Sequence, residues 1–268
     1  PKPVIAHRTS PTNIGLYLLS TLAARDFGWT GLARTVARLE ETFGTLVQMP
    51  RHNGHFLNWY GTRDLQVLQP AYVSAVDSGN LAGHLLVVAA ACEAWCHQNE
   101  VQDPYSAVDD HLRLMEQALA AAPLPAGSPA ETFHSRLAEL RADVALAQPW
   151  PALLAALLPL SEPLLQAARQ AAPGTPDGEE PALLFACRAL HDMLQEHDYD
   201  RRHQDGPGWL APRLLRLAQQ ARDLAYGMDF RFLVNPERQL LSIGFSVADN
   251  QLDGSCYDLL ASEARLAS

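Results

Sequence analysis

The stretch SPTNIGLYLLSTL, residues 10–22, decides the fold. Ser10 can cap a helix, and Pro11 suits the first helical position because its missing N–H would have no partner there. Apolar side chains then cover nearly the whole circumference of the predicted helix. Because a helix that is apolar all round is typical of a protein interior, we expect this one to be buried on all sides.

The next predicted helix, residues 30–49, has a different pattern. Its apolar residues lie three or four positions apart, which predicts one buried and one wet face: Leu32, Val36, Leu39, Phe43 and Leu46. A third helix, capped by Asp77 or Ser78, is again apolar, and a fourth, at about 107–121, is again amphipathic. This alternation of inner and outer helices predicts an all-α fold, an incomplete α/α toroid of helical hairpins. A plain helical bundle is the alternative.

The middle of the chain, from about 123 to 212, shows no site-like group of residues and is interpreted as scaffold. Helices are expected at about 129–147, 151–172, 181–198 and 211–226, and the Pro- and Ala-rich part at about 123–212 is a possible helical insertion in a single domain spanning 1–268. Small β-hairpins are expected at 55–60 and 230–245, and a short helix at 257–266.

Composition excludes several functions. The chain has 268 residues, 48% of them apolar, and a net charge of −10, which argues against a nucleic-acid partner. No apolar run reaches the roughly 20 residues of a membrane span, so direct membrane contact is not expected. The four cysteines are expected to be reduced, and no phosphate loop or metal-like set predicts a cofactor or a metal. Because the chain begins with Pro1 and not with methionine, we expect it to be a piece of a longer protein.

Three groups of residues could carry chemistry. Glu263 falls in the middle of an apolar helix face, where burial would raise its pKa toward that of a general acid; an exposed or arginine-paired glutamate is the alternative. Asp77, with Asn80, stands at the mouth of an inner helix, where it could equally be a helix cap. The loop around Trp59 combines aromatic rings with amides and could either hold a sugar or fill the core.

Several blocks of the sequence resemble the glucoamylase-like segment of the cyclic β-1,2-glucan synthases. They are AHRTSPTNIGL at 6–16, GHFLNWY at 54–60, YVSAVDSGNLAG at 72–83, LSIGF at 241–245 and YDLLASEARL at 257–266. The blocks follow the family's order, although Ala75 stands where threonine is expected and Gly61 where aspartate is expected. The part from about 100 to 210 carries no such motif.

The resemblance implies a retaining transglycosylase that cyclises linear β-1,2-glucan as one module of a large synthase at the cytoplasmic face of the inner membrane. Glu263 matches the position expected for the acid/base, and the nucleophile is expected beyond Ser268. The residues expected to line the glucan cleft are Arg8, Asn13, Trp59, Tyr60, Asp77 and Asn80. An endo-β-1,2-glucan hydrolase and a non-catalytic, glucan-binding scaffold are the alternatives, and this fragment alone is expected to be inactive.

Overall fold

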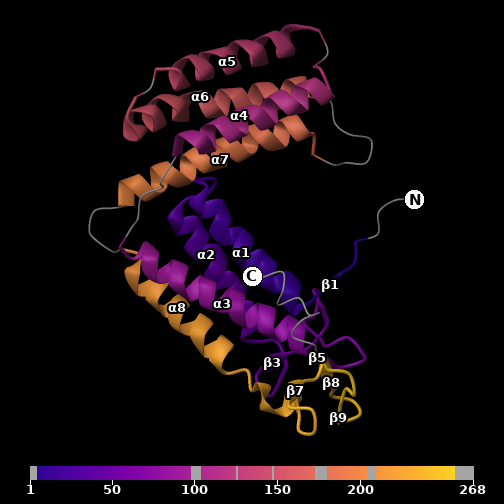
Figure 1. Ribbon diagram of the computed structural model, residues 1–268. Coiled ribbons are helices and arrows are strands. Elements are labelled where there is room, and N and C mark those ends of the chain that lie inside the picture. The colour runs from indigo at the N-terminus through magenta and orange to yellow at the C-terminus, as the bar shows by residue number, and fades with distance from the viewer. Residues whose placement is uncertain are drawn as a thin grey trace. The chain divides into compact units, whose positions relative to one another are not determined.

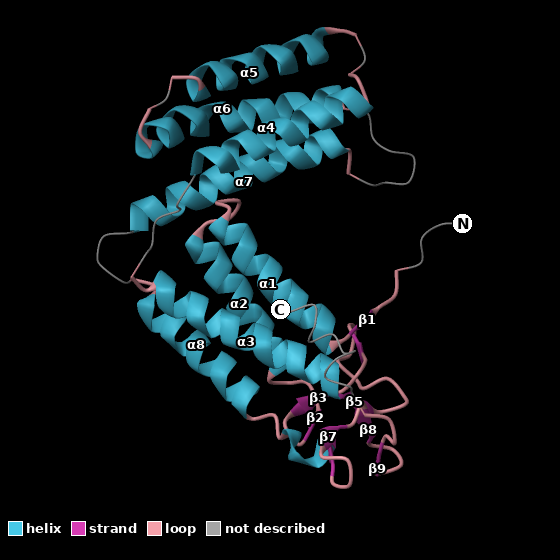
Figure 2. Cartoon of the chain, in the orientation of Figure 1, coloured by secondary structure: helices cyan, strands magenta, loops and turns pink. Residues whose placement is uncertain are grey.

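A computed structural model describes residues 5–97, 104–124, 126–146, 148–172, 180–203 and 209–256. In this part the chain is mostly helical with a few short strands (Figure 2), which confirms the predicted all-α class with small β-hairpins. The α-helices are α1 Pro11–Asp26, α2 Leu32–Leu46, α3 Ala75–Trp95, α4 Pro104–Ala121, α5 Ser128–Val144, α6 Trp150–Ala171, α7 Ala182–His203 and α8 Ala211–Tyr226. The predicted helix at 257–266 lies outside the described residues.

The short strands form four small antiparallel sheets. The strands are β1 Arg8–Thr9, β2 Arg51–His52, β3 His55–Phe56, β4 Tyr60–Gly61, β5 Tyr72–Ser74, β6 Val234–Asn235, β7 Leu240–Leu241, β8 Gly244–Ser246 and β9 Gln251–Leu252. The pairs are β1–β4, β2–β3 and β6–β7, and the fourth sheet has the order β5-β8-β9. The predicted hairpin at 230–245 is wrong in part, because Phe230–Leu233 is a 3₁₀-helix whose N-terminus is capped by Asp229.

The described chain divides into two compact units. The first contains residues 1–22, 37–98 and 210–268, and the second contains 23–36 and 99–209. Most of the predicted insertion at about 123–212 falls in the second unit. The longer segment of that unit begins before the predicted insertion, at Asn99. That this region is an insertion into one domain stays a prediction.

In the first unit, α8 packs along α3 (Figure 1). The buried side chains of α8 recur at helical spacing: Leu214, Leu217, Ala218, Ala221, Leu224 and Ala225. Two arginines outside this buried face bind to neighbouring helices. Arg222 donates to both carboxylate oxygens of Glu93 in α3, and Arg213 donates to both carboxylate oxygens of Glu40 in α2. The predicted alternation assigned the place beside α3 to α4, but α8 occupies it, and α4 packs on α7 in the second unit.

Helices α1 and α3 approach closely at Gly15. A Cβ at this position would lie 2.2 Å from Nδ1 of His84, so any larger residue would require the His84 ring to move. The expectation that α1 is buried on all sides is wrong, because Leu16 and Tyr17 are 54% and 51% exposed. On α3, Leu86 and Val87 are also exposed. Both helices therefore bury one face in the first unit and leave an apolar face open, which periodicity alone could not reveal.

The second unit encloses one continuous cluster of buried apolar side chains. Helices α4, α5, α6 and α7 all contribute to it, with Met115, Phe133, Leu140, Leu157 and Leu190 fully buried. Helices α3 and α6 are long and apolar enough to cross a membrane, contrary to the sequence expectation. Core helices pass the same test, and 39% and 44% of the most apolar windows of α3 and α6 are buried inside the protein.

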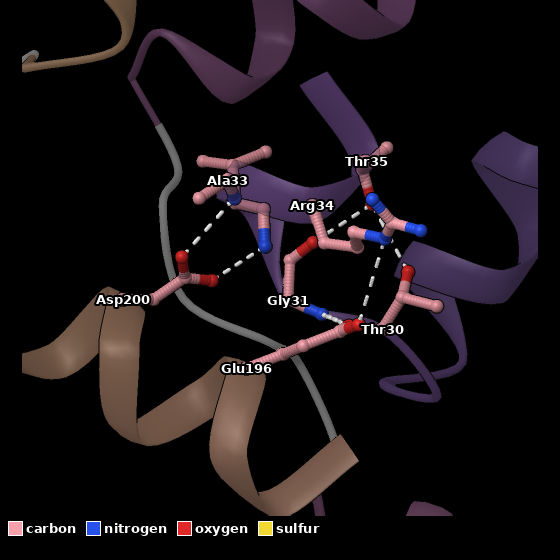
Figure 3. Close-up of polar contacts among 8 residues, drawn as sticks. Thr30, Gly31, Ala33, Arg34, Thr35, Glu196 and Asp200 are labelled. Atoms are coloured by element: carbon pink, nitrogen blue, oxygen red, sulfur yellow. Dashed lines mark hydrogen bonds and ion pairs between the residues drawn. The ribbon is translucent and has the colours of Figure 1, made fainter. Parts of the chain in front are cut away.

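The first turn of α2 is capped by side chains from α7 (Figure 3). Glu196 accepts a hydrogen bond from the N–H of Gly31 at 2.9 Å, and Asp200 accepts from Leu32 and, at 3.1 Å, from Ala33. A Cβ on Gly31 would lie 2.8 Å from Asp200 Oδ2 and 2.9 Å from the Glu196 carbonyl oxygen. Residue 31 therefore has no side chain, and α7 supplies the carboxylates that a local cap would otherwise provide.

Candidate functional site

The motif blocks that lie far apart in the sequence meet in one region of the first unit. Pairing of β1 with β4 joins residues 8–9 to 60–61, and pairing of β5 with β8 joins 72–74 to 244–246. The N–H of Asn58 donates to the Tyr72 carbonyl at 2.8 Å, and the ring of His52 stacks on Phe245 with centroids 5.4 Å apart. The four motif blocks within the described residues therefore build a single local structure.

Arg8 and Trp59 form the aromatic part of this region. Arg8 pairs with Gly61 in the β1–β4 sheet, and its guanidinium carbon lies 4.6 Å from the centre of the Trp59 ring. A guanidinium over an indole face is a cation–π contact. Arg8 is exposed and Trp59 is partly exposed, so the pair presents a ring edge and several N–H donors to solvent.

Asp77 links the beginnings of α1 and α3. Thr12 in the first turn of α1 donates its hydroxyl to Oδ1 of Asp77 in the first turn of α3. A carboxylate there is favoured by the positive ends of both helix dipoles. The cap of α3 is Ser74, whose Oγ accepts from the N–H of Asp77, so the prediction that Asp77 or Ser78 caps this helix is wrong. The carboxylate of Asp77 therefore does not cap α3.

Asn13 and Asn80 flank the Thr12–Asp77 contact. Asn13 follows Thr12 in the first turn of α1, where its N–H donates to Oγ of Ser10 at 3.2 Å, which confirms Ser10 as the cap. Asn80 lies one helical turn beyond Asp77 on α3. Both residues are exposed, so their amide side chains can reach a ligand near the two helix beginnings.

Tyr60 lies in the interior. It is fully buried, its hydroxyl donates to the Pro50 carbonyl at 2.6 Å and accepts from the N–H of Leu57 at 2.7 Å. Burial raises the pKa of Tyr60 to about 12. Phe56 is buried beside it, with ring centroids 6.5 Å apart. In this position Tyr60 supports the loop that carries Trp59, as in the core-filling alternative for the aromatic loop.

His55 was not among the residues predicted for the site. Its ring is fully buried against the rings of Phe230 and Phe232, with centroids 4.7 and 5.3 Å away. Burial lowers the pKa of His55, and the backbone of Asp229 opposes this with a smaller effect. The His55 ring packs the 54–60 block against the 3₁₀-helix. The alternating pattern of residues 55–60 was the sequence signal that could have indicated a buried histidine.

Glu263, the predicted acid/base, lies outside the described residues. Within the described ranges, no group of three His, Cys, Asp or Glu side chains is arranged to hold a metal ion. The site described here thus consists of Arg8, Trp59, Asn13, Asp77 and Asn80 around the beginnings of two helices.

Comparison with known proteins gives one informative relative. No protein-family model matches the sequence. The whole chain is 42% identical to a segment of the cyclic beta-(1,2)-glucan synthase NdvB of Rhizobium meliloti (strain 1021), and it spans 10% of that protein's length. Identity at this level over the length of the chain establishes homology to that segment of NdvB, which confirms the resemblance found in the motif blocks.

Proposed function

We propose that this chain is part of a retaining transglycosylase module that cyclises linear β-1,2-glucan within a cyclic β-1,2-glucan synthase. The observation that carries the proposal is that the described motif blocks converge on one local structure, in a chain homologous to NdvB over its whole length. The complete module would be an α/α toroid, and the apolar faces left open on α1 and α3 are consistent with further helices packing there.

The proposed glucan cleft uses the exposed groups of the site. Arg8 and Trp59 offer an aromatic surface with adjacent donors, and Asn13, Asp77 and Asn80 offer groups that can hydrogen-bond to sugar hydroxyls. Tyr60 contributes by holding the loop, since its hydroxyl is engaged with backbone groups. The cleft needs no cofactor or metal for acid/base chemistry on a glycosidic bond.

The proposed chemistry proceeds in two displacements. Glu263 gives its proton to the glycosidic oxygen while a second carboxylate, expected beyond Ser268 and about 5 Å away, attacks the anomeric carbon. The C–O bond to the leaving chain breaks and a glucosyl-enzyme ester forms. Glu263 then accepts the proton of the glucan's own non-reducing-end hydroxyl as that oxygen attacks the anomeric carbon and displaces the enzyme carboxylate, which closes the ring and regenerates both carboxyl groups. The fragment alone would be inactive.

Two other functions remain as proposals. An endo-β-1,2-glucan hydrolase would use the same residues but admit water to the glucosyl-enzyme. A non-catalytic segment that grips glucan and joins modules of the same polypeptide would use the site without Glu263. In each case the parent protein would act at the cytoplasmic face of the inner membrane.

The test uses the parent module, extended past Ser268, with linear β-1,2-glucan as substrate. Mass spectrometry separates cyclic products from linear ones of equal length, because a ring is lighter by one water. We expect rings from the wild type and none from Glu263→Gln. The control is Glu237→Gln, which alters an exposed glutamate in the β6–β7 turn. Rings from both variants would remove Glu263 from the mechanism, and shortened linear chains would favour the hydrolase.

A further inference from the structure

The end of α7 carries a cluster of aromatic side chains. Tyr199 and His203 are one turn apart, and their rings stack with centroids 4.0 Å apart and planes 26° apart. Trp209 follows the helix and lies 6.1 Å from Tyr199 and 5.9 Å from His203. All three residues belong to the second unit. We name this group the Tyr199–His203–Trp209 cluster.

The cluster is open to solvent. Tyr199 is 48% exposed, His203 is exposed and Trp209 is partly exposed. Solvent-facing aromatic rings lose part of the stabilisation that the same rings gain in a core. The ring of His203 is fixed through Nδ1, which lies 2.7 Å from the Tyr199 carbonyl oxygen. The three rings thus form a preorganised surface.

Two arginines lie between Tyr199 and His203 in the last turn of α7. Arg202 is three positions after Tyr199 and therefore lies on the same side of the helix as that residue. Its Nη2 contacts Oδ2 of Asp198 at 2.5 Å, and Arg201 contacts Oδ1 of the same carboxylate at 2.9 Å. The Asp198 side chain is 7% exposed, whereas that of Arg202 is 61% exposed. The buried carboxylate therefore orients a guanidinium that keeps further N–H donors in solvent.

We propose that the Tyr199–His203–Trp209 cluster and Arg202 form a second glucan-binding subsite, separate from the residues around Asp77. A pyranose ring has apolar C–H faces and an equator of hydroxyl groups. The aromatic rings can stack against such a face, and Arg202 can donate to the hydroxyls.

The choice of glucan as occupant rests on the proposed function, since the relative NdvB is a cyclic beta-(1,2)-glucan synthase. A subsite in the second unit would assign a function to this part of the chain, which carries no motif. It would retain a long glucan while another part of the polymer reacts, and binding at two linked sites raises the local concentration of the chain at each.

Affinity electrophoresis of the 268-residue chain tests the proposal, with native gels containing linear β-1,2-, β-1,3- or α-1,4-glucan. We expect β-1,2-glucan to retard the wild type, and Tyr199→Ala and Trp209→Ala each to raise the apparent Kd about fivefold. Tyr199→Phe and Trp209→Phe keep a ring and should retain binding. The matched control is Phe185→Ala, on the same helix and 52% exposed, which should bind as the wild type does.

Each outcome bears on one of the two proposals. Weaker retardation of the alanine variants, with full retardation of the ring-preserving variants and of Phe185→Ala, supports the subsite. If that pattern arises with a different glucan, the subsite stands and the β-1,2 linkage of the proposed function fails. Retardation that is absent in all gels, or equally weakened by Phe185→Ala, overturns the subsite. A change in oligomeric state without any retardation identifies the cluster as a self-association surface and also overturns it.

Discussion

In the second unit, four helices enclose one continuous cluster of buried apolar side chains, whereas in the first unit α1 and α3 keep large apolar side chains in contact with solvent. The first unit relies on small sheets, on two bidentate arginine–glutamate pairs of α8 and on the Thr12–Asp77 contact. The comparison shows that the motif blocks lie in the unit where neighbouring apolar side chains of α1 and α3 are exposed. The unit without motifs has one continuous buried cluster, although single apolar side chains such as Leu114 and Phe185 are exposed there too.

The largest expected effect follows from the closed core. Leu190 is fully buried in the cluster of the second unit, so Leu190→Ala removes packed methyl groups and leaves a cavity. We expect the free energy of unfolding to fall by about 3 kcal/mol, measured by urea denaturation with circular dichroism. The matched variant Leu86→Ala changes a leucine of α3 that is 38% exposed and should cost less than about 0.5 kcal/mol. Equal losses would contradict the burial of Leu190 and the exposure of Leu86.

An intermediate effect is expected from the cap of α2. Asp200→Ala leaves the N–H groups of Leu32 and Ala33 without their acceptor in a buried place, and we expect a loss of about 2 kcal/mol in the free energy of unfolding. Asp200→Asn keeps an acceptor oxygen and should lose less. The control Glu180→Gln alters a partly exposed pair with Arg188 and should stay within about 0.5 kcal/mol. If Asp200→Ala left the free energy of unfolding unchanged, water would have replaced the carboxylate as the hydrogen-bond acceptor.

The smallest expected effect is a loss of stability at acidic pH. Burial lowers the pKa of His55 in the first unit and of His111 and His197 in the second. For His197, the nearby Asp200 opposes this, while Arg25 and His111 add to it. An unfolded histidine takes up a proton near pH 6.5, but these folded ones do so only at lower pH. Stability is therefore present above pH 6.5 and is lost as the pH falls toward 5.

Thermal melts at pH 7, 6 and 5 check this direction. The variant His197→Gln can still donate to the Gly28 carbonyl, which His197 Nε2 contacts at 2.7 Å, but it cannot titrate. We expect its melting temperature to depend less on pH than that of the wild type. An unchanged dependence would mean that His197 takes up its proton equally well in the folded state.

The sequence predicted the helices well because each depends on local periodicity. Residues 211–226 were placed with the bounds that α8 has in the structure, and Ser10 was correctly identified as the cap of α1. Errors arose where distant partners decide. The exposure of Leu16 and Tyr17 depends on which helices surround α1, and the place beside α3 is taken by a helix that begins 116 residues after α3 ends.

The candidate site was predicted in part. Motif blocks indicated the region of Arg8, Trp59 and Asp77, but only the β1–β4 and β5–β8 pairings bring those blocks together. Tyr60 could not be distinguished from Trp59 by residue type, because alternation along a short strand predicts opposite faces without saying which face is inward. The caps on Gly31 could not be predicted either, since Glu196 and Asp200 lie more than 160 positions away.

That separation has a consequence for synthesis. The first turn of α2 is complete only after Asp200, 168 residues later, has left the ribosome. At ordinary elongation rates this interval is on the order of ten seconds. Until then the amides of Leu32 and Ala33 are satisfied by water, and the nascent helix begins with a frayed turn. Contacts this far apart also raise the contact order, which slows folding. The start of an early helix is therefore among the last parts of the chain to reach its final structure.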